Sequence, residues 1–118
     1  ELHNLTDTEN LNVVAFEKET MDKLGLIPEI APRYRATYFS HIIGGYAAGY
    51  YSYLWAEVLD TDAFEAFKEH GVFDKNTADS FRKNILEKGG TEDPMTLYRG
   101  FRGADPSLEP LLKNRGLK

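Results

Sequence analysis

The stretch HIIGGYAAGYYSY, residues 41–53, is the most informative part of this chain. It holds four tyrosines and one histidine, and six of the seven tyrosines of the protein lie between Tyr34 and Tyr53. Glycines interrupt the stretch, so we expect a mobile loop that is helical only in part. Tyr46, Tyr50 and Tyr53 are spaced by four and three residues, and on a helical backbone their phenols share one face.

These side chains suit the chemistry of a ligand site. A phenol is a neutral donor near pH 7, and it can stabilise the negative charge that develops during attack on an amide. His41 adds a further donor or a proton shuttle. Gly44, Gly45 and Gly49 allow the loop to open and close over a ligand. The alternative is an ordinary packing seam with its hydroxyls satisfied at the surface, which is the commoner use of such residues.

Capping residues and apolar periodicity predict short helices on both sides of this stretch. Thr6 and Glu9 match a capping box at the start of a first helix over residues 6–25, which Gly25 ends. After the loop, a helix is expected from about residue 50 to residue 59. Its apolar stripe, expected to pack on the core, consists of Tyr51, Leu54, Trp55 and Val58.

Further helix starts follow along the rest of the chain. Asp60-Thr61 and Thr77 are expected to cap two helices, and Asp93-Pro94 and Asp105-Pro106 place proline at the favoured first position of two more. No alternation typical of a strand is strong enough to predict a sheet. The expected fold is therefore all-α, a bundle of five or six short helices with a helical subdomain over residues 50–118.

Composition excludes several classes of function. The net charge is −5, from 14 basic and 19 acidic residues, which disfavours a nucleic-acid or anionic-membrane partner. Cysteine is absent, so a disulfide framework and a thiolate metal site are excluded. No apolar run approaches the length of a membrane span and no signal peptide is visible. The chain begins with Glu1, so we expect that it was cut from a longer protein.

The histidines do not form a recognisable metal motif. No His-Glu-x-x-His pair occurs, and this is the usual two-histidine zinc helix. His70 lies near an expected helix end, where it is expected to cap carbonyl groups and meet the helix dipole. We therefore expect no metal site from His3, His41 or His70. Ser40 lies beside His41, but no nucleophile elbow surrounds it.

With its flanks, the stretch resembles the C-terminal signature of the thimet oligopeptidase family, which includes oligopeptidase A and bacterial dipeptidyl carboxypeptidase. The similarity starts at Phe39-Ser40-His41 and continues from Gly44 to Trp55. Arg33-Tyr34-Arg35 and the terminal Asn114-Arg115-Gly116-Leu117 favour the dipeptidyl carboxypeptidase branch. Similar residues recur downstream: Asp62-Ala63-Phe64, Ser80-Phe81-Arg82, Ile85-Leu86, Gly89-Gly90, Asp93-Pro94, Leu97-Tyr98 and Phe101-Arg102-Gly103.

The resemblance implies a zinc metallopeptidase, of which residues 1–118 are the C-terminal part of the catalytic region. Enzymes of this family are mostly helical, and two lobes flank a deep channel. Their zinc ligands lie upstream of the signature, so zinc is expected in the parent enzyme and not in this chain. Short peptides and the missing upstream part are the expected partners, and a cytoplasmic location is expected.

Individual roles follow from the same resemblance. Tyr53 matches the catalytic tyrosine that hydrogen-bonds the scissile carbonyl and its oxyanion. His41 matches a histidine that binds the substrate backbone, and Tyr46 and Tyr50 match tyrosines that lie near the substrate. Within the substrate loop, residues 39–53, the glycines that match its flexible positions are Gly44, Gly45 and Gly49.

Two functions of different class stay open. In the first, the parent enzyme hydrolyses short peptides and releases dipeptides from their C-terminus, and this chain alone is inactive. The alternative is a stand-alone helical module that holds a peptide in the same loop without catalysis. A fragment is expected to expose apolar surface or to self-associate, whereas a module is expected to be monomeric and to bind by itself.

Overall fold

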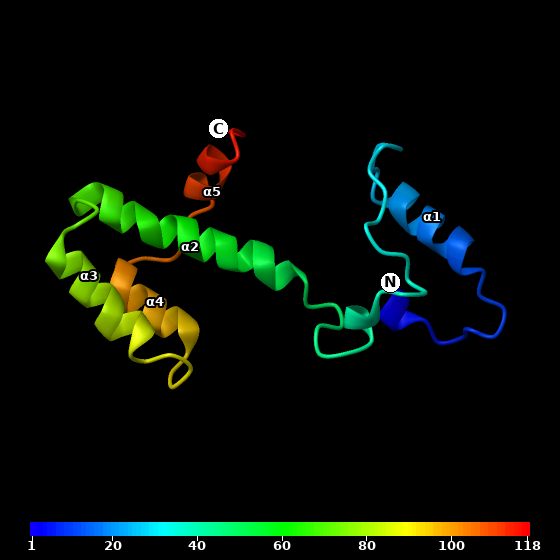
Figure 1. Ribbon diagram of the computed structural model, residues 1–118, viewed down its shortest axis with the longest axis horizontal. Coiled ribbons are helices and arrows are strands. Elements are labelled where there is room, and N and C mark those ends of the chain that lie inside the picture. Colours follow the sequence, from blue (N-terminus) through cyan, green and yellow to red (C-terminus); the bar gives the residue numbers. More distant parts are fainter. The chain divides into compact units, whose positions relative to one another are not determined.

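The computed structural model describes residues 1–118 and contains helices and turns but no strand, which confirms the all-α expectation. Contacts divide the chain into two compact units, residues 1–50 and residues 51–118. The α-helices are α1 (Val13–Lys23), α2 (Tyr51–His70), α3 (Lys75–Phe81), α4 (Pro94–Arg102) and α5 (Glu109–Asn114) (Figure 1). Helical turns also occur at Leu2–Asn4, Ser40–Ile42 and Arg82–Leu86.

In the first unit, α1 is shorter than expected. The side chain of Asn12 accepts a hydrogen bond from the Ala15 amide at 3.1 Å and caps the helix. The predicted capping box of Thr6 and Glu9 is wrong, because the Glu9 amide donates at 3.1 Å to Asp7 in a separate turn. The helix is followed by Gly25, whose φ of +67° suits its role as the stop signal.

Glu17 fastens the segment before the tyrosine-rich stretch to α1. One carboxylate oxygen accepts from the Ala36 amide at 2.6 Å, and the other accepts from the Arg35 guanidinium at 3.0 Å. These partners, the Ala36 amide above all, hold the pKa of Glu17 below its usual value. The contact fixes the direction in which the chain enters the candidate site.

In the second unit, α2 is one helix of 20 residues rather than the two helices expected on either side of Asp60-Thr61. The Thr61 hydroxyl donates back to the carbonyls of Glu57 (2.7 Å) and Val58 (3.1 Å), so it does not cap a new helix. Such back-bonding is compatible with a continuous helix.

Aspartate side chains cap the N-termini of both α3 and α4. Asp93 accepts from the Thr96 amide at 2.9 Å and Pro94 begins α4, as expected. For α3, the cap is Asp74 and not Thr77: Asp74 accepts from the Thr77 amide at 2.7 Å. The backbone donors lower the pKa of both aspartates.

The predicted helix start at Asp105-Pro106 is wrong. Asp105 accepts a hydrogen bond from Arg99 at 2.6 Å instead of capping a helix. Four residues further along the chain, α5 begins at Glu109, whose amide donates to the Ser107 hydroxyl at 3.2 Å. Because the Asp105 side chain pairs with Arg99, it does not cap a helix.

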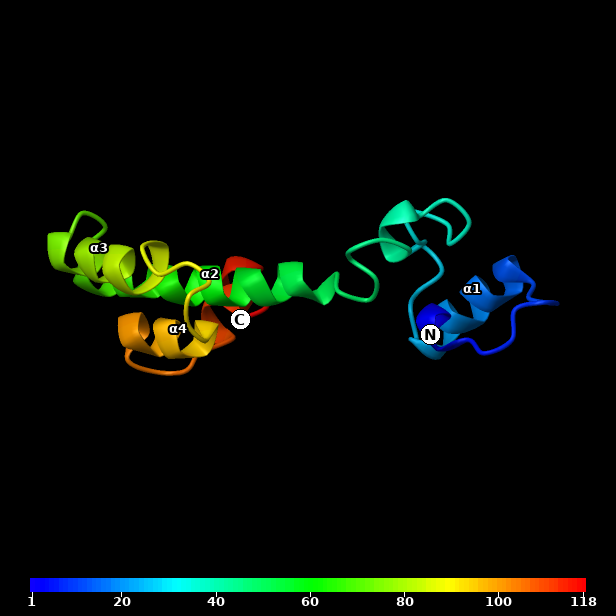
Figure 2. The same ribbon diagram turned by 90° about the horizontal axis from the view of Figure 1, so that it is seen from below.

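The core of the second unit is small and lies along the second half of α2 (Figures 1 and 2). Phe67, Phe81 and Phe101 meet there, and the ring of Phe81 lies edge-on to the other two at centroid distances of 6.0 and 5.1 Å. The buried apolar residues of this unit are Val58, Ala66, Leu97, Tyr98 and Leu111.

The first half of α2 extends beyond this core and is exposed (Figure 2). Of the expected apolar stripe, only Val58 is buried, while Tyr51, Leu54 and Trp55 are 75 %, 50 % and 46 % exposed. The expected packing of the whole stripe is therefore wrong within this chain, because α5 reaches α2 only as far as Glu57 and the turns before it have no covering helix. None of the helices combines the length and the apolar character needed to cross a bilayer.

Candidate functional site

The first unit brings together three of the residues expected in a site. The ring of Tyr46 stacks on Tyr50 with centroids 4.9 Å apart and an interplanar angle of 27°, and the imidazole of His41 lies 5.4 Å from Tyr46. His41 belongs to the helical turn Ser40–Ile42, and turns carry the chain onward to Tyr50. These side chains therefore meet through turns and not along one helical face.

Two further aromatic residues extend this group. Phe39 lies 5.3 Å from the Tyr50 ring, and Tyr34 stacks on Phe39 at 5.0 Å with an interplanar angle of 16°. The five rings of Tyr34, Phe39, His41, Tyr46 and Tyr50 form what we call the aromatic ladder. The concentration of tyrosines from Tyr34 onward was the sequence signal for its extent. Tyr34 lies outside the expected substrate loop, and Phe39 lies within it but was given no individual role.

A hollow of about 580 Å³ opens beside the ladder. This volume lies within the range of small-ligand sites. One side chain of the lining, Arg33, carries a positive charge and none is a carboxylate, so the hollow suits a ligand with a negative group. The lining residues are Pro32, Arg33, Tyr34, Tyr38, Phe39, Ser40, His41 and Tyr50.

The environment of Tyr50 keeps its phenol protonated. Partial desolvation raises its pKa, and the neighbouring phenols of Tyr46 and Tyr34 raise it further. At neutral pH, Tyr50 is therefore a hydrogen-bond donor, as needed for contact with a carbonyl or carboxylate oxygen.

The three glycines of the loop differ in how much space a side chain would have at each position. The Gly49 amide donates to the Tyr46 carbonyl at 2.6 Å, and a Cβ on Gly49 would lie 2.8 Å from that oxygen. A Cβ on Gly44 would have its nearest neighbour at 3.9 Å, and one on Gly45 would meet nothing within 4 Å. Between them, Ala47 has a φ of +42°. The tight turn that presents Tyr46 and Tyr50 thus depends on Gly49.

Gly49→Ala is expected to displace Tyr46 from Tyr50, because the new methyl group and the Tyr46 carbonyl cannot occupy the same space. Nuclear Overhauser effects between the two rings, which lie 4.9 Å apart, should be lost. Gly45→Ala is the matched control and should retain them, since its Cβ has open space. Equal spectra for both variants would contradict this account of the turn.

The expected catalytic residue lies in the other unit. Tyr53 is in the first turn of α2, and its side chain is 59 % exposed. His41, Tyr46 and Tyr50 belong to residues 1–50, whereas Tyr53 belongs to residues 51–118. The roles expected for these residues remain predictions.

The other two histidines, His3 and His70, belong to different units. His70 ends α2, and its Nδ1 lies 3.3 Å from the Thr77 hydroxyl, a contact with a side chain rather than the expected capping of carbonyl groups. His3 lies in the helical turn Leu2–Asn4. No group of three or more histidine, aspartate or glutamate side chains is arranged to hold a metal ion.

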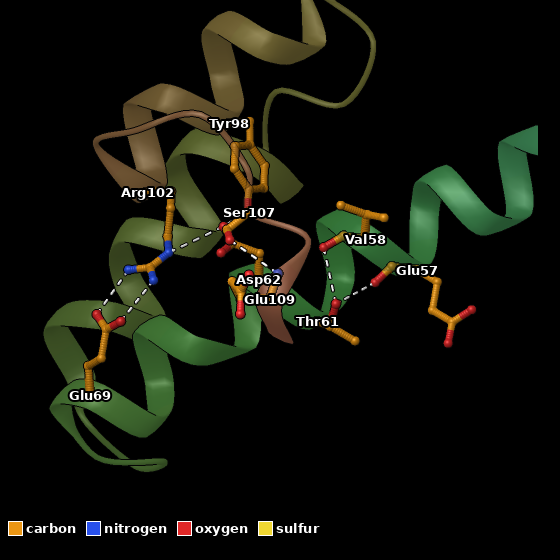
Figure 3. Close-up of polar contacts among 9 residues, drawn as sticks. All are labelled: Glu57, Val58, Thr61, Asp62, Glu69, Tyr98, Arg102, Ser107 and Glu109. Carbon is orange, nitrogen blue, oxygen red and sulfur yellow. Dashed lines mark hydrogen bonds and ion pairs between the residues drawn. The ribbon is translucent and has the colours of Figure 1, made fainter. Parts of the chain in front are cut away.

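A buried polar network in the second unit was not expected from the sequence (Figure 3). The Asp62 side chain is buried on α2, where it accepts a hydrogen bond from the Tyr98 hydroxyl and lies 3.5 Å from the Arg102 guanidinium. Arg102 also donates two hydrogen bonds to Glu69, at 2.8 and 2.9 Å. Burial, followed by the bond to Asp62, raises the pKa of Tyr98 far above its usual range. The network therefore joins α4 to α2 and has a structural role.

Comparison with known proteins gives one consistent result. The sequence model of peptidase family M3 matches residues 1–117. Oligopeptidase A of Haemophilus influenzae is 44 % identical over 98 % of the chain, and that of Escherichia coli is 57 % identical over 68 %. Dipeptidyl carboxypeptidase of Escherichia coli is 43 % identical over 96 % of the chain. The chain covers 12 to 17 % of the length of these relatives.

Proposed function

Because the chain belongs to peptidase family M3, we propose that it is the substrate-binding C-terminal part of a larger zinc peptidase that cleaves short peptides. The aromatic ladder and its hollow are the observation that carries this proposal. They provide phenol and imidazole groups, a cavity of suitable size and a positive charge in one place. A peptide offers the matching carbonyl groups and a terminal carboxylate.

The exposed apolar surface supports a role as part of a larger protein. Twenty large apolar or aromatic side chains are exposed, and Phe73 (96 %), Ile43 (83 %) and Val14 (72 %) are among the most exposed. Monomeric proteins rarely expose extensive apolar surface unless it binds something. We propose that the upstream part of the enzyme covers it, and that the isolated chain self-associates through it.

Within the enzyme, we assign each group a role. Tyr53 would donate a hydrogen bond to the oxyanion that forms when water attacks the scissile carbonyl. His41, Tyr46 and Tyr50 would hold the peptide in the orientation that this attack requires. Gly44, Gly45 and Gly49 would allow the loop to adjust around the bound peptide.

No group of three or more histidine, aspartate or glutamate side chains in this chain is arranged to hold a metal ion. Enzymes of family M3 are generally zinc-dependent, and we propose that the metal is bound by the upstream part of the enzyme. Its chemistry would be to polarise the carbonyl and activate water.

The proposal is tested by comparing the full-length protein that contains this chain with the isolated residues 1–118. We expect the full-length protein to cleave short peptides and to lose this activity when a chelator removes zinc. The isolated chain should cleave nothing and should associate with itself in analytical ultracentrifugation. A monomeric isolated chain that binds peptides tightly would favour the alternative, a stand-alone binding module.

The branch of the family is a separate point. Over nearly the whole chain, identity to an oligopeptidase A (44 %) and to a dipeptidyl carboxypeptidase (43 %) is almost equal. We propose release of dipeptides from the C-terminus because of Arg33-Tyr34-Arg35 and Asn114-Arg115-Gly116-Leu117, and analysis of the products by mass spectrometry tests it. The cytoplasmic location also stays a proposal.

A further inference from the structure

Glu17 on α1 contacts the segment that leads into the aromatic ladder. Its carboxylate accepts hydrogen bonds from the Ala36 amide at 2.6 Å and from the Arg35 guanidinium at 3.0 Å. The Glu17 side chain is only 11 % exposed, whereas that of Arg35 is 55 % exposed. Glu17 does not line the hollow beside the ladder. Any effect of Glu17 on a ligand in that hollow must therefore pass through the segment that it holds.

The contact holds the start of a turn that places Phe39. The Arg35 carbonyl accepts hydrogen bonds from the amides of Tyr38 and Phe39, both at 3.1 Å. The turn thus begins at the residues that Glu17 binds. Phe39 lines a hollow against α1 as well as the hollow beside the ladder. The position of its ring therefore depends on where Glu17 holds the beginning of the turn.

Phe39 connects this turn to the rest of the ladder. The centroid of its ring lies 5.0 Å from that of Tyr34, 5.3 Å from that of Tyr50 and 6.1 Å from that of His41. The Phe39 carbonyl also accepts a hydrogen bond from the Ile42 amide at 3.2 Å, at the helical turn that carries His41. A displacement of Phe39 would therefore disturb His41 and Tyr50, the two side chains of the hollow to which peptide binding is assigned.

We propose that Glu17 is a positioning residue, which sets the affinity for the peptide substrate by holding Ala36 and, through Phe39, the aromatic ladder. This rests on the proposed function and adds to it a residue that does not touch the substrate. The Ala36 amide is the more important partner, since it fixes the backbone itself and its hydrogen bond to a carboxylate is charge-assisted. Without Glu17, this partly buried amide would lose its acceptor, and the turn would move to find another.

Steady-state kinetics of the full-length protein that contains this chain test the effect on the substrate. Glu17→Ala is expected to raise KM for a short peptide about 10-fold, the loss typical of one hydrogen bond to a charged group. The change in kcat should be small, because the groups that move are assigned to binding and not to the chemical step. Glu17→Gln should raise KM less, because its amide oxygen can still accept from Ala36. Glu19→Ala, at an exposed position of the same helix, is the matched control and should leave KM unchanged.

The position of Phe39 can be measured separately from catalysis. In the full-length protein, Phe39→4-fluorophenylalanine places a fluorine-19 label on the ring, and the neighbouring rings of Tyr34 and Tyr50 shift its resonance. We expect Glu17→Ala to move this resonance towards its frequency in the unfolded protein. Glu17→Gln and Glu19→Ala should keep it close to the position in the wild type.

The two measurements together decide the inference. A resonance that stays in place in Glu17→Ala would overturn it. A resonance that moves while KM is unchanged would also overturn it, since Glu17 would then have only a structural role, and so would an equal rise of KM in Glu19→Ala. A protein that cleaves no peptide contradicts the proposed function instead. The resonance of Phe39 would then decide alone whether Glu17 positions the ladder.

Discussion

Tyr53→Phe in the full-length protein is expected to lower kcat by about 100- to 1,000-fold, the usual loss when one oxyanion donor is removed. KM should change little, because the hydrogen bond would form only as the oxyanion develops. The substitution removes one oxygen atom from a side chain that is 59 % exposed in α2. Packing should therefore be preserved, and the effect should lie in the chemical step.

Tyr51→Phe is the matched control for this experiment. Tyr51 lies on the same helical turn and is 75 % exposed, but it has no assigned role. Steady-state kinetics with one peptide, together with thermal unfolding of each variant, distinguishes chemistry from stability. A kcat that is unchanged in Tyr53→Phe would remove Tyr53 from the mechanism, and equal losses in both variants would indicate a general effect on the start of α2.

Local signals in the sequence were sufficient where a helix start depends only on its own residues. Asp93-Pro94 is such a case, because the Asp93 side chain accepts a hydrogen bond from the Thr96 amide only three residues away. Asp60-Thr61 has the same local character but lies inside a helix. The neighbouring Asp62 finds its partner Tyr98 36 residues later in the sequence. A pairing of this range helps to hold this part of α2 in the core, and it cannot be read from local sequence.

In the candidate site, too, some features follow from local sequence and others depend on tertiary contacts. The closeness of His41, Tyr46 and Tyr50 follows from their spacing within one short segment. The stacking of Tyr34 on Phe39 involves a segment that Glu17 holds through Ala36, 19 residues further along the chain. Tertiary contacts, and not local preference, therefore determined the extent of the site.

The polar network of the second unit allows a sharp stability prediction. Arg102→Leu removes the cation beside Asp62, a side chain that is only 4 % exposed. Removing one partner of a buried ion pair typically costs about 3–5 kcal/mol, because the other charge is left without compensation. This is a large share of the free energy of unfolding of a small domain, which is about 5–15 kcal/mol. Urea unfolding of residues 1–118, followed by circular dichroism, measures the loss.

Arg99→Leu is the control, on the same helix and of the same chemistry. Its pair with Asp105 is exposed on both sides (55 % and 68 %), so its loss should cost at most about 1 kcal/mol.

The difference in stability between Arg102→Leu and the wild type should shrink as pH falls towards 4. Arg102 holds the pKa of Glu69 below its usual value, so this contribution to stability is present above the unfolded pKa of Glu69 and is lost on acidification. Equal destabilisation by the two variants at neutral pH would mean that the network in Figure 3 is no stronger than a surface ion pair.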